Sequence, residues 1–146
     1  MAWQLSHIGL CVADLERARR FYCEGLGFRE VSTLEVRDEP AATLLQIPNV
    51  ELQAVYLERD GFRLELLYYR HPGAIVGTTP HQMNACGLTH LSFQADDITE
   101  LEQRLLALGG QPLPETRVEL DGIGLVALFV LDPDGTRIEL VRRLNG

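Results

Sequence analysis

Two histidines and two glutamates occupy matched places in this 146-residue chain and are the strongest candidates for chemistry. His7 and His90 each stand at the start of an alternating apolar segment, and Glu65 and Glu139 each follow an Asp-Gly turn. Imidazole and carboxylate groups suit a divalent ion such as Ni, Zn, Co, Mn or Fe, and such a site leaves positions for water or substrate. A structural zinc site is disfavoured, because the set offers no sulfur.

An internal repeat accounts for the matched places. The segment DGFRLEL at 60–66 is closely matched by DGTRIEL at 134–140, and HIGLCVADL at 7–15 is matched by HLSFQADDI at 90–98. The chain therefore contains two copies of one module, each opening on a strand with a His and closing on a strand with a Glu.

The modules span residues 5–70 and 88–143, and a connecting loop covers 71–87, where Gly and Pro recur without a usable period. Each module is small, and the whole length fits one ordinary domain. We therefore expect the modules to share a core in a single domain, 1–146.

Each module is predicted to fold as βαβββ, from its alternation and turn signals. The fold class is thus α+β, a cupped mixed sheet of about eight strands with helices on its outer face. A helix should follow Asp14 in one module and Asp96 or Asp97 in the other. Residues 41–47 form either a short helix or a loop. The predicted strands are 6–13, 28–36, 50–57 and 62–69, then 88–95, 111–120, 123–131 and 136–143.

Alternation also predicts which way the four candidate side chains point. Apolar residues flank each His and Glu along its strand and should face the helices. The four residues are thus expected on the helix-free face, where an approximate two-fold axis would bring them together. Taken singly, a strand His is more often hydrogen-bonded or exposed, and Glu65 or Glu139 could simply pair with Arg63 or Arg137. Four matched positions favour the metal interpretation.

Composition limits the partners. The formal net charge is -8 and no basic stripe is visible, which argues against nucleic acid. No apolar run approaches the roughly 20 residues that cross a membrane. Three Cys cannot all pair internally and no secretory signal begins the chain, so we expect a cytoplasmic protein that acts on a small molecule.

Four segments resemble the vicinal oxygen chelate superfamily, which includes glyoxalase I, methylmalonyl-CoA epimerase, extradiol dioxygenases and bleomycin-resistance proteins. The segments are HIGLCVADLERARRFYCEGLGF at 7–28, LELLYY at 64–69, GLTHLSFQADD at 87–97 and DPDGTRIEL at 132–140. The resemblance implies paired βαβββ units around a divalent metal, with ligands at His7, Glu65, His90 and Glu139, and often a homodimer whose site is built within one chain or from two.

This His, Glu, His, Glu set is most similar to that of glyoxalase I, whereas the epimerases typically carry Gln at the place of Glu65. The additional Glu base of an epimerase would align near Asn49 or Glu51. The resemblance thus implies a lyase or isomerase that stabilises an enediolate or enolate, with Glu139 or Glu65 as the base. The loops at 37–49 and 70–87 would set specificity and could act as lids.

Two alternatives stay open at this point. One is an Fe(II) dioxygenase in which His7 or His90 acts with Glu139 in a facial triad, although Glu65 would then occupy a position that oxygen needs. The other is a non-catalytic protein that sequesters a small molecule, as drug-resistance relatives do, although such a protein usually needs no metal ligands.

Overall fold

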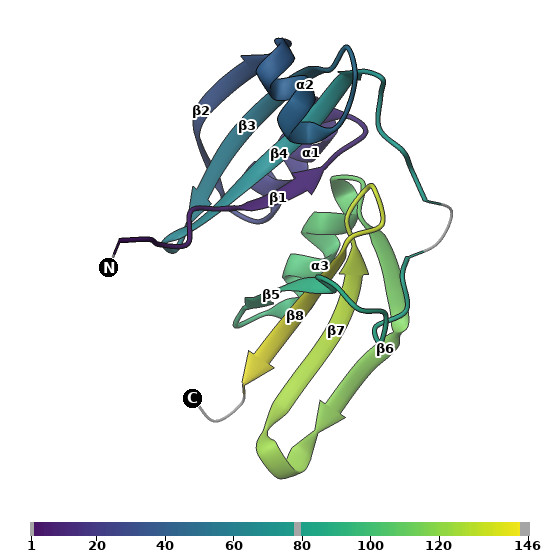
Figure 1. Cartoon of the computed structure of the whole chain (residues 1–146). Helices are drawn as coiled ribbons and strands as arrows, with labels where there is room; N and C mark the ends of the chain where they lie inside the picture. Colours follow the sequence, from purple (N-terminus) through teal and green to yellow (C-terminus); the bar gives the residue numbers. More distant parts are fainter. Residues whose placement is uncertain (1, 78–79, 144–146) are drawn as a thin grey trace. The chain divides into compact units, whose positions relative to one another are not determined.

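The chain divides between Val76 and Gly77 into two compact units, which are described separately. The computed structural model (Figure 1) describes residues 2–77 and 80–143. The division falls inside the predicted connecting loop. The expectation of one domain over residues 1–146 stays a prediction.

Each unit contains one four-stranded mixed sheet. The order is β1-β4-β3-β2 in the N-terminal unit and β5-β8-β7-β6 in the C-terminal unit. The first and last strands of each unit run parallel, and the other neighbours run antiparallel. The predicted α+β class, the eight strands and the duplicated βαβββ plan are confirmed. The strands are β1 (Ile8–Cys11), β2 (Arg29–Val36), β3 (Glu51–Arg59), β4 (Phe62–His71), β5 (His90–Gln94), β6 (Gln111–Leu120), β7 (Leu125–Leu131) and β8 (Arg137–Arg143).

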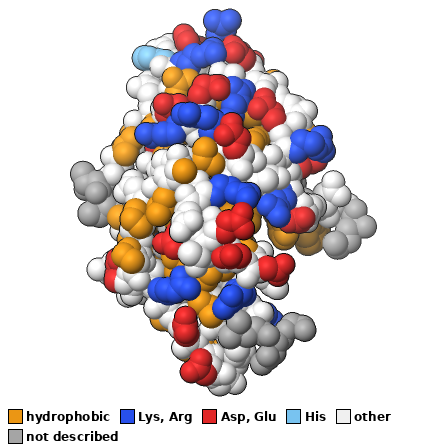
Figure 2. All heavy atoms as spheres, turned by 180° about the vertical axis from the view of Figure 1, so that it is seen from behind, with side chains coloured by type: hydrophobic (Ala, Val, Ile, Leu, Met, Phe, Trp, Pro, Cys, Tyr) orange, Lys and Arg blue, Asp and Glu red, His pale blue; other side chains and the backbone are white. Residues whose placement is uncertain are grey.

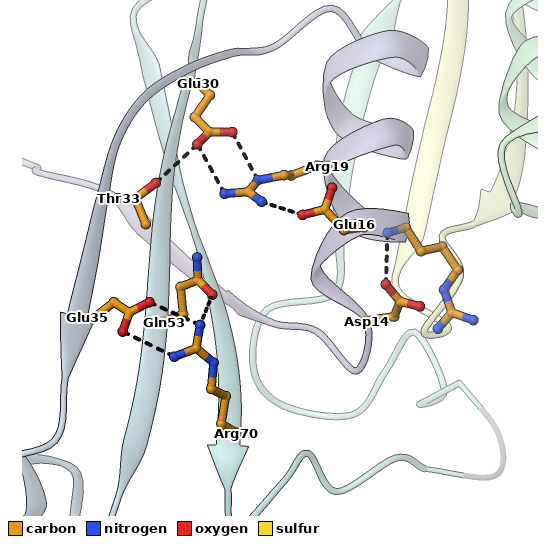
Figure 3. Close-up of polar contacts among 9 residues, drawn as sticks. Asp14, Glu16, Arg19, Glu30, Thr33, Glu35, Gln53 and Arg70 are labelled. Atoms are coloured by element: carbon orange, nitrogen blue, oxygen red, sulfur yellow. Dashed lines mark hydrogen bonds and ion pairs between the residues drawn. The ribbon is translucent and has the colours of Figure 1, made fainter.

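A capped helix follows the first strand of each unit, as predicted. Asp14 accepts a hydrogen bond from the backbone N–H of Arg17 at 3.0 Å and starts α1 (Leu15–Arg19), which continues as the π-helical turn η1 (Arg20–Gly25). Figure 3 shows this cap beside the contacts that tie Arg19 of α1 to Glu30 of β2. Asp97 rather than Asp96 caps α3 (Ile98–Ala107).

The segment left open as helix or loop forms α2 (Glu39–Leu45). Asp38 caps it by accepting from the N–H of Ala41 at 2.9 Å, and a proline is tolerated in the first turn, where its missing N–H costs nothing. Partly buried Leu67 and Tyr69 of β4 join the core beneath α2. These two residues share a strand face with Glu65, so the expectation that this face lacks a helix is wrong in the N-terminal unit.

The hairpin turn before each glutamate differs between the units. Asp60 and Gly61 adopt φ of 51° and 79° and close a two-residue turn, a left-handed conformation that suits Asp-Gly. In the C-terminal unit the loop is longer, and Asp132, only 1% exposed, accepts hydrogen bonds from the backbone N–H groups of Asp134 and Thr136 at 2.9 and 2.8 Å. Both turns fix where the following strand begins.

Strand β6 is an edge strand, a position that tolerates its residues Pro112 and Pro114, and its register with β7 shifts between Leu113 and Val118. The short 3-10 helix η2 (Asp121–Ile123) joins these two strands. No helix in residues 2–77 and 80–143 is both long and apolar enough to span a membrane. Basic and acidic side chains are interspersed on the face drawn in Figure 2.

Candidate metal centre

His7 and Glu65, called the N-terminal pair, lie in contact. The Nε2 atom of His7 is 2.9 Å from Oε2 of Glu65, and the two side chains are 32% and 15% exposed. The parallel register of β1 and β4 sets Gly9 beside Glu65, which brings His7 to the same end of the sheet. The second oxygen of Glu65 accepts a hydrogen bond from the hydroxyl of Tyr56 at 2.9 Å.

His90 and Glu139, called the C-terminal pair, repeat this arrangement more loosely. Nε2 of His90 is 3.8 Å from Oε2 of Glu139, and each side chain is 29% exposed. The other oxygen, Oε1 of Glu139, accepts a hydrogen bond from Oγ of Ser92 at 2.7 Å. The β5–β8 register sets Ser92 beside Glu139, as the β1–β4 register sets Gly9 beside Glu65.

A hydroxyl group holds the second ring nitrogen of each histidine. Oγ of Ser6 lies 2.8 Å from Nδ1 of His7, and Oγ1 of Thr89 lies 2.8 Å from Nδ1 of His90. A hydroxyl can accept from Nδ1–H, and that tautomer leaves the lone pair of Nε2 available on the side of the glutamate. Such contacts on the far nitrogen are the usual means of orienting a metal-binding imidazole.

An aromatic edge fixes each imidazole from a third direction. The ring centroids of His7 and Tyr56 are 5.3 Å apart at an interplanar angle of 86°. Those of His90 and Phe129 are 5.5 Å apart at 82°. Because Tyr56 and Phe129 stand opposite Glu65 and Glu139 in the strand registers, the two pairs have equivalent surroundings.

The alternative in which the glutamates pair with neighbouring arginines does not describe the N-terminal unit. Nε of Arg63 donates to Glu58 at 3.0 Å, and its guanidinium carbon lies 5.8 Å from the Tyr56 ring centroid. In the C-terminal unit the guanidinium of Arg137 donates to the backbone oxygen of His81.

Charge and burial affect the tyrosines near Glu65. Burial raises the pKa of Tyr56, and the hydrogen bond to Glu65 and the charge of that carboxylate raise it further. Burial also raises the pKa of Tyr69, with smaller contributions from Cys11 and Glu65. Both phenols therefore stay protonated, and Tyr56 remains a hydrogen-bond donor to the carboxylate near neutral pH.

The donor set fits a hard to borderline divalent ion. Neighbouring ligand atoms around an octahedral ion with bonds of about 2.1 Å are about 3.0 Å apart, close to the spacing of the N-terminal pair. Taken over its described residues, neither unit gathers three or more His, Cys, Asp or Glu side chains in one place. Each unit thus offers one pair. Asn49 and Glu51, the positions considered for an additional base, are exposed, and so are the remaining two histidines, His71 and His81.

The pattern of metal-binding residue types in the sequence did not point to the five hydroxyl and aromatic neighbours, which are Ser6, Tyr56, Thr89, Ser92 and Phe129. Ser6 and Thr89 each directly precede a candidate histidine, and this repeated hydroxyl-His step was visible in the sequence. Tyr56 and Phe129 left no such signal, because the loops between each of them and its glutamate differ in length.

The sequence is similar to proteins that have different activities. Lactoylglutathione lyase of Arabidopsis thaliana is 30% identical over 142 residues, covering 94% of this chain but 43% of that protein, so the chain spans less than half the plant enzyme. The ethylmalonyl-CoA/methylmalonyl-CoA epimerase of Cereibacter sphaeroides is 25% identical over 142 residues, covering 96% of this chain and 98% of that protein.

A glyoxalase family protein from Bacillus cereus shares the fold, with a TM-score of 0.82 at 21% identity, over 97% of this chain and 95% of that one. Residues 4–140 match the sequence model of the Glyoxalase/Bleomycin resistance protein/Dioxygenase superfamily, which covers nearly the whole chain. This protein therefore belongs to the glyoxalase, bleomycin-resistance and dioxygenase superfamily.

Proposed function

We propose that the protein is a divalent-metal-dependent lyase or isomerase that moves a proton on a small substrate held through two neighbouring oxygens. The observation that carries the proposal is the repeated pair: in each unit a His Nε2 faces a Glu Oε2, while Nδ1 and Oε1 are both held by hydroxyl groups. Superfamily membership and the lyase and epimerase among the relatives support the same reaction class.

In this proposal His7, Glu65, His90 and Glu139 serve one ion, drawn from Ni, Zn, Co, Mn and Fe. Two neutral imidazoles and two carboxylates balance the charge of a divalent cation and leave room for substrate. When bound, the ion supplies a Lewis acid for the negative charge that develops on a substrate oxygen. The chain's task is to present four donor atoms and to move the proton.

Glu139 is the better candidate for the base. Glu65 is the more buried of the two glutamates, and its oxygens contact both His7 Nε2 and the Tyr56 hydroxyl at 2.9 Å. Glu139 is 29% exposed, and although Ser92 holds its Oε1 at 2.7 Å, its Oε2 lies 3.8 Å from His90 Nε2, which leaves Oε2 freer than that of Glu65 to reach a substrate carbon. It would accept the proton from one carbon and return it to the neighbouring position, while Glu65 remains a fixed ligand.

Helix α2 and the residues around it are candidates for contacting the substrate. The residues 37–49 include this helix, which packs on Leu67 and Tyr69 of the strand that carries Glu65. We propose that this segment and residues 70–87 set specificity. We also propose a homodimer, to be tested by light scattering of the purified protein, because relatives that share a site between two chains would need one.

The proposal is tested by turnover with and without metal. Protein stripped with a chelator is reloaded separately with each candidate ion and assayed with the hemithioacetal of methylglyoxal and glutathione and with methylmalonyl-CoA. Glu139→Gln should lower kcat by about 10²–10⁴-fold. Glu119→Gln, an exposed carboxylate on β6, serves as the matched control and should retain activity.

Turnover that survives chelation, or a Glu139→Gln variant within about twofold of the parent, would remove the proposal. Oxygen uptake with catechols by the iron-loaded protein would instead support the dioxygenase alternative. Ligand binding that needs neither a metal nor the four residues would support the sequestering alternative.

A further inference from the structure

The two glutamates receive their hydroxyl contacts from different strands. Glu65 accepts from Tyr56 on β3, while the residue beside it on β1 is Gly9, which has no side chain to donate. Glu139 accepts from Ser92 on β5, while the residue opposite it on β7 is Phe129, which has no hydroxyl. The hydroxyl donor therefore lies on the antiparallel neighbour of the glutamate in the N-terminal unit and on the parallel neighbour in the C-terminal unit.

The neighbours of Glu65 and Glu139 are arranged alike, and only the strand that carries the hydroxyl differs. Each glutamate has one neighbour on the parallel strand and one on the antiparallel strand. In each unit one of the two carries a hydroxyl, at 2.9 Å from Oε1 of Glu65 or 2.7 Å from Oε1 of Glu139. In each unit the aromatic neighbour also packs edge-on against the histidine, whether or not it carries the hydroxyl.

The hydroxyl contact determines which carboxylate oxygen faces the histidine. A hydroxyl that donates to Oε1 fixes the rotation of the carboxylate, so that Oε2 is the oxygen turned to the histidine Nε2. A glutamate held in this way offers one oxygen to a cation rather than two, which keeps another coordination position open for substrate.

We infer that Tyr56 and Ser92 are interchangeable positioning residues that hold Glu65 and Glu139 as one-oxygen ligands, and that either strand of each unit can supply the hydroxyl. The inference rests on the proposed metal-dependent function. It assigns no proton transfer to Tyr56 or Ser92, which act through the glutamates.

The structure allows the hydroxyl to be moved. A Cβ atom added at Gly9 would lie 3.9 Å from Oε2 of Glu65 and 3.3 Å from Cδ1 of Leu67. Once the flexible Leu67 side chain shifts by a few tenths of an ångström, a serine there reaches Oε2, the nearer carboxylate oxygen. It would then hold Glu65 by Oε2 and leave Oε1 as the single oxygen offered to the cation. Phe129 already occupies the place equivalent to Tyr56, so Phe129→Tyr puts a phenol opposite Glu139.

The experiment measures Co²⁺ binding to metal-free protein by competition with a chromophoric chelator, and records the visible spectrum of the loaded protein. Tyr56→Phe and Ser92→Ala should each weaken Co²⁺ binding about tenfold and alter the spectrum, because the freed Oε1 changes the coordination geometry. Tyr68→Phe, a matched loss of a phenol from the other face of β4, should leave both unchanged.

The decisive variants restore the hydroxyl from the other strand. Tyr56→Phe combined with Gly9→Ser, and Ser92→Ala combined with Phe129→Tyr, should recover the parent spectrum and most of the affinity. A general loss of packing would not be repaired by a second substitution on another strand, so recovery separates positioning from structural damage.

The outcomes separate this inference from the proposed function. If the parent binds Co²⁺ but the single variants bind equally well, or the double variants stay as weak as the single ones, the inference is wrong and the metal site stands. If the parent binds no Co²⁺, the proposed function itself is wrong and the role of the two hydroxyls ends with it.

Discussion

Replacing Asp132 should destabilise the C-terminal unit more than most single substitutions. Its carboxylate is buried, and one oxygen, Oδ1, accepts from the backbone N–H groups of Asp134 and Thr136 at 2.9 and 2.8 Å. Asp132→Ala leaves both N–H groups without this acceptor in a partly buried turn. Hydrogen bonds to charged groups contribute about 1.5–3 kcal/mol each, and since the two share one oxygen we expect a total loss of about 2–4 kcal/mol.

Urea unfolding followed by circular dichroism measures this loss. With an m-value of about 2 kcal/mol per molar urea, the midpoint should fall by about 1–2 M. Asp132→Asn is the matched control, because its amide oxygen can still accept both bonds, and it should cost about 1 kcal/mol. An Asp132→Ala variant within about 0.5 kcal/mol of the parent would refute the assignment of this turn as the anchor of β8, the strand that carries Glu139.

Two further predictions concern the N-terminal unit. Gly27→Ala should lower the free energy of unfolding by about 1–3 kcal/mol, measured by thermal unfolding, because φ is +74° and the new Cβ would lie 2.6 Å from Nη1 of Arg59. The control Gly61→Ala has φ of +79° but open space around the new Cβ, so it should lower the free energy of unfolding by less. The hydrogen bond and charge of Arg70 lower the pKa of Glu35 (Figure 3), so the pair stabilises the fold above about pH 4.5 and this contribution is lost as pH falls through the lowered pKa. Arg70→Gln should therefore show a smaller loss of stability than the parent between about pH 5.5 and 3.5 at low salt; equal losses would contradict the assignment.

Much of the fold followed from local signals in the sequence. The repeat around Asp-Gly predicted two equivalent hairpins, and Asp14 and Asp97 stand where the sequence places helix caps. Helix α2 was ambiguous because Asp38 and Pro40 are typical both of a break and of a helix start. The packing of Ala41 on Val50 and Leu52 favours the helix over the loop. Such tertiary contacts cannot be read from the sequence of a short segment.

The sequence predicted which strand carries each His and each Glu, but it predicted neither the parallel pairing of those strands nor the surroundings of the side chains. The contacts of His7 with Glu65 and of His90 with Glu139 follow from parallel strand pairing of duplicated segments. Counting back from the Asp-Gly steps aligns Tyr56 with Val130, whereas the longer loop after β7 places Phe129 opposite its glutamate. The aromatic residue and its glutamate are nine positions apart in the N-terminal unit and ten in the C-terminal unit, and this one-residue difference moves the equivalence to the next residue and therefore to the other face of the strand.

The number of metal ions that the chain binds tests the central claim most directly. Metal-free protein is titrated with Co²⁺, and the bound metal is confirmed by elemental analysis of the parent and of His7→Ala and His90→Ala. If the two pairs serve one ion, the parent binds one Co²⁺ per chain, and each variant loses that binding entirely. Two independent ions per chain, with each variant losing only one, would contradict the claim, as would a parent protein that binds none.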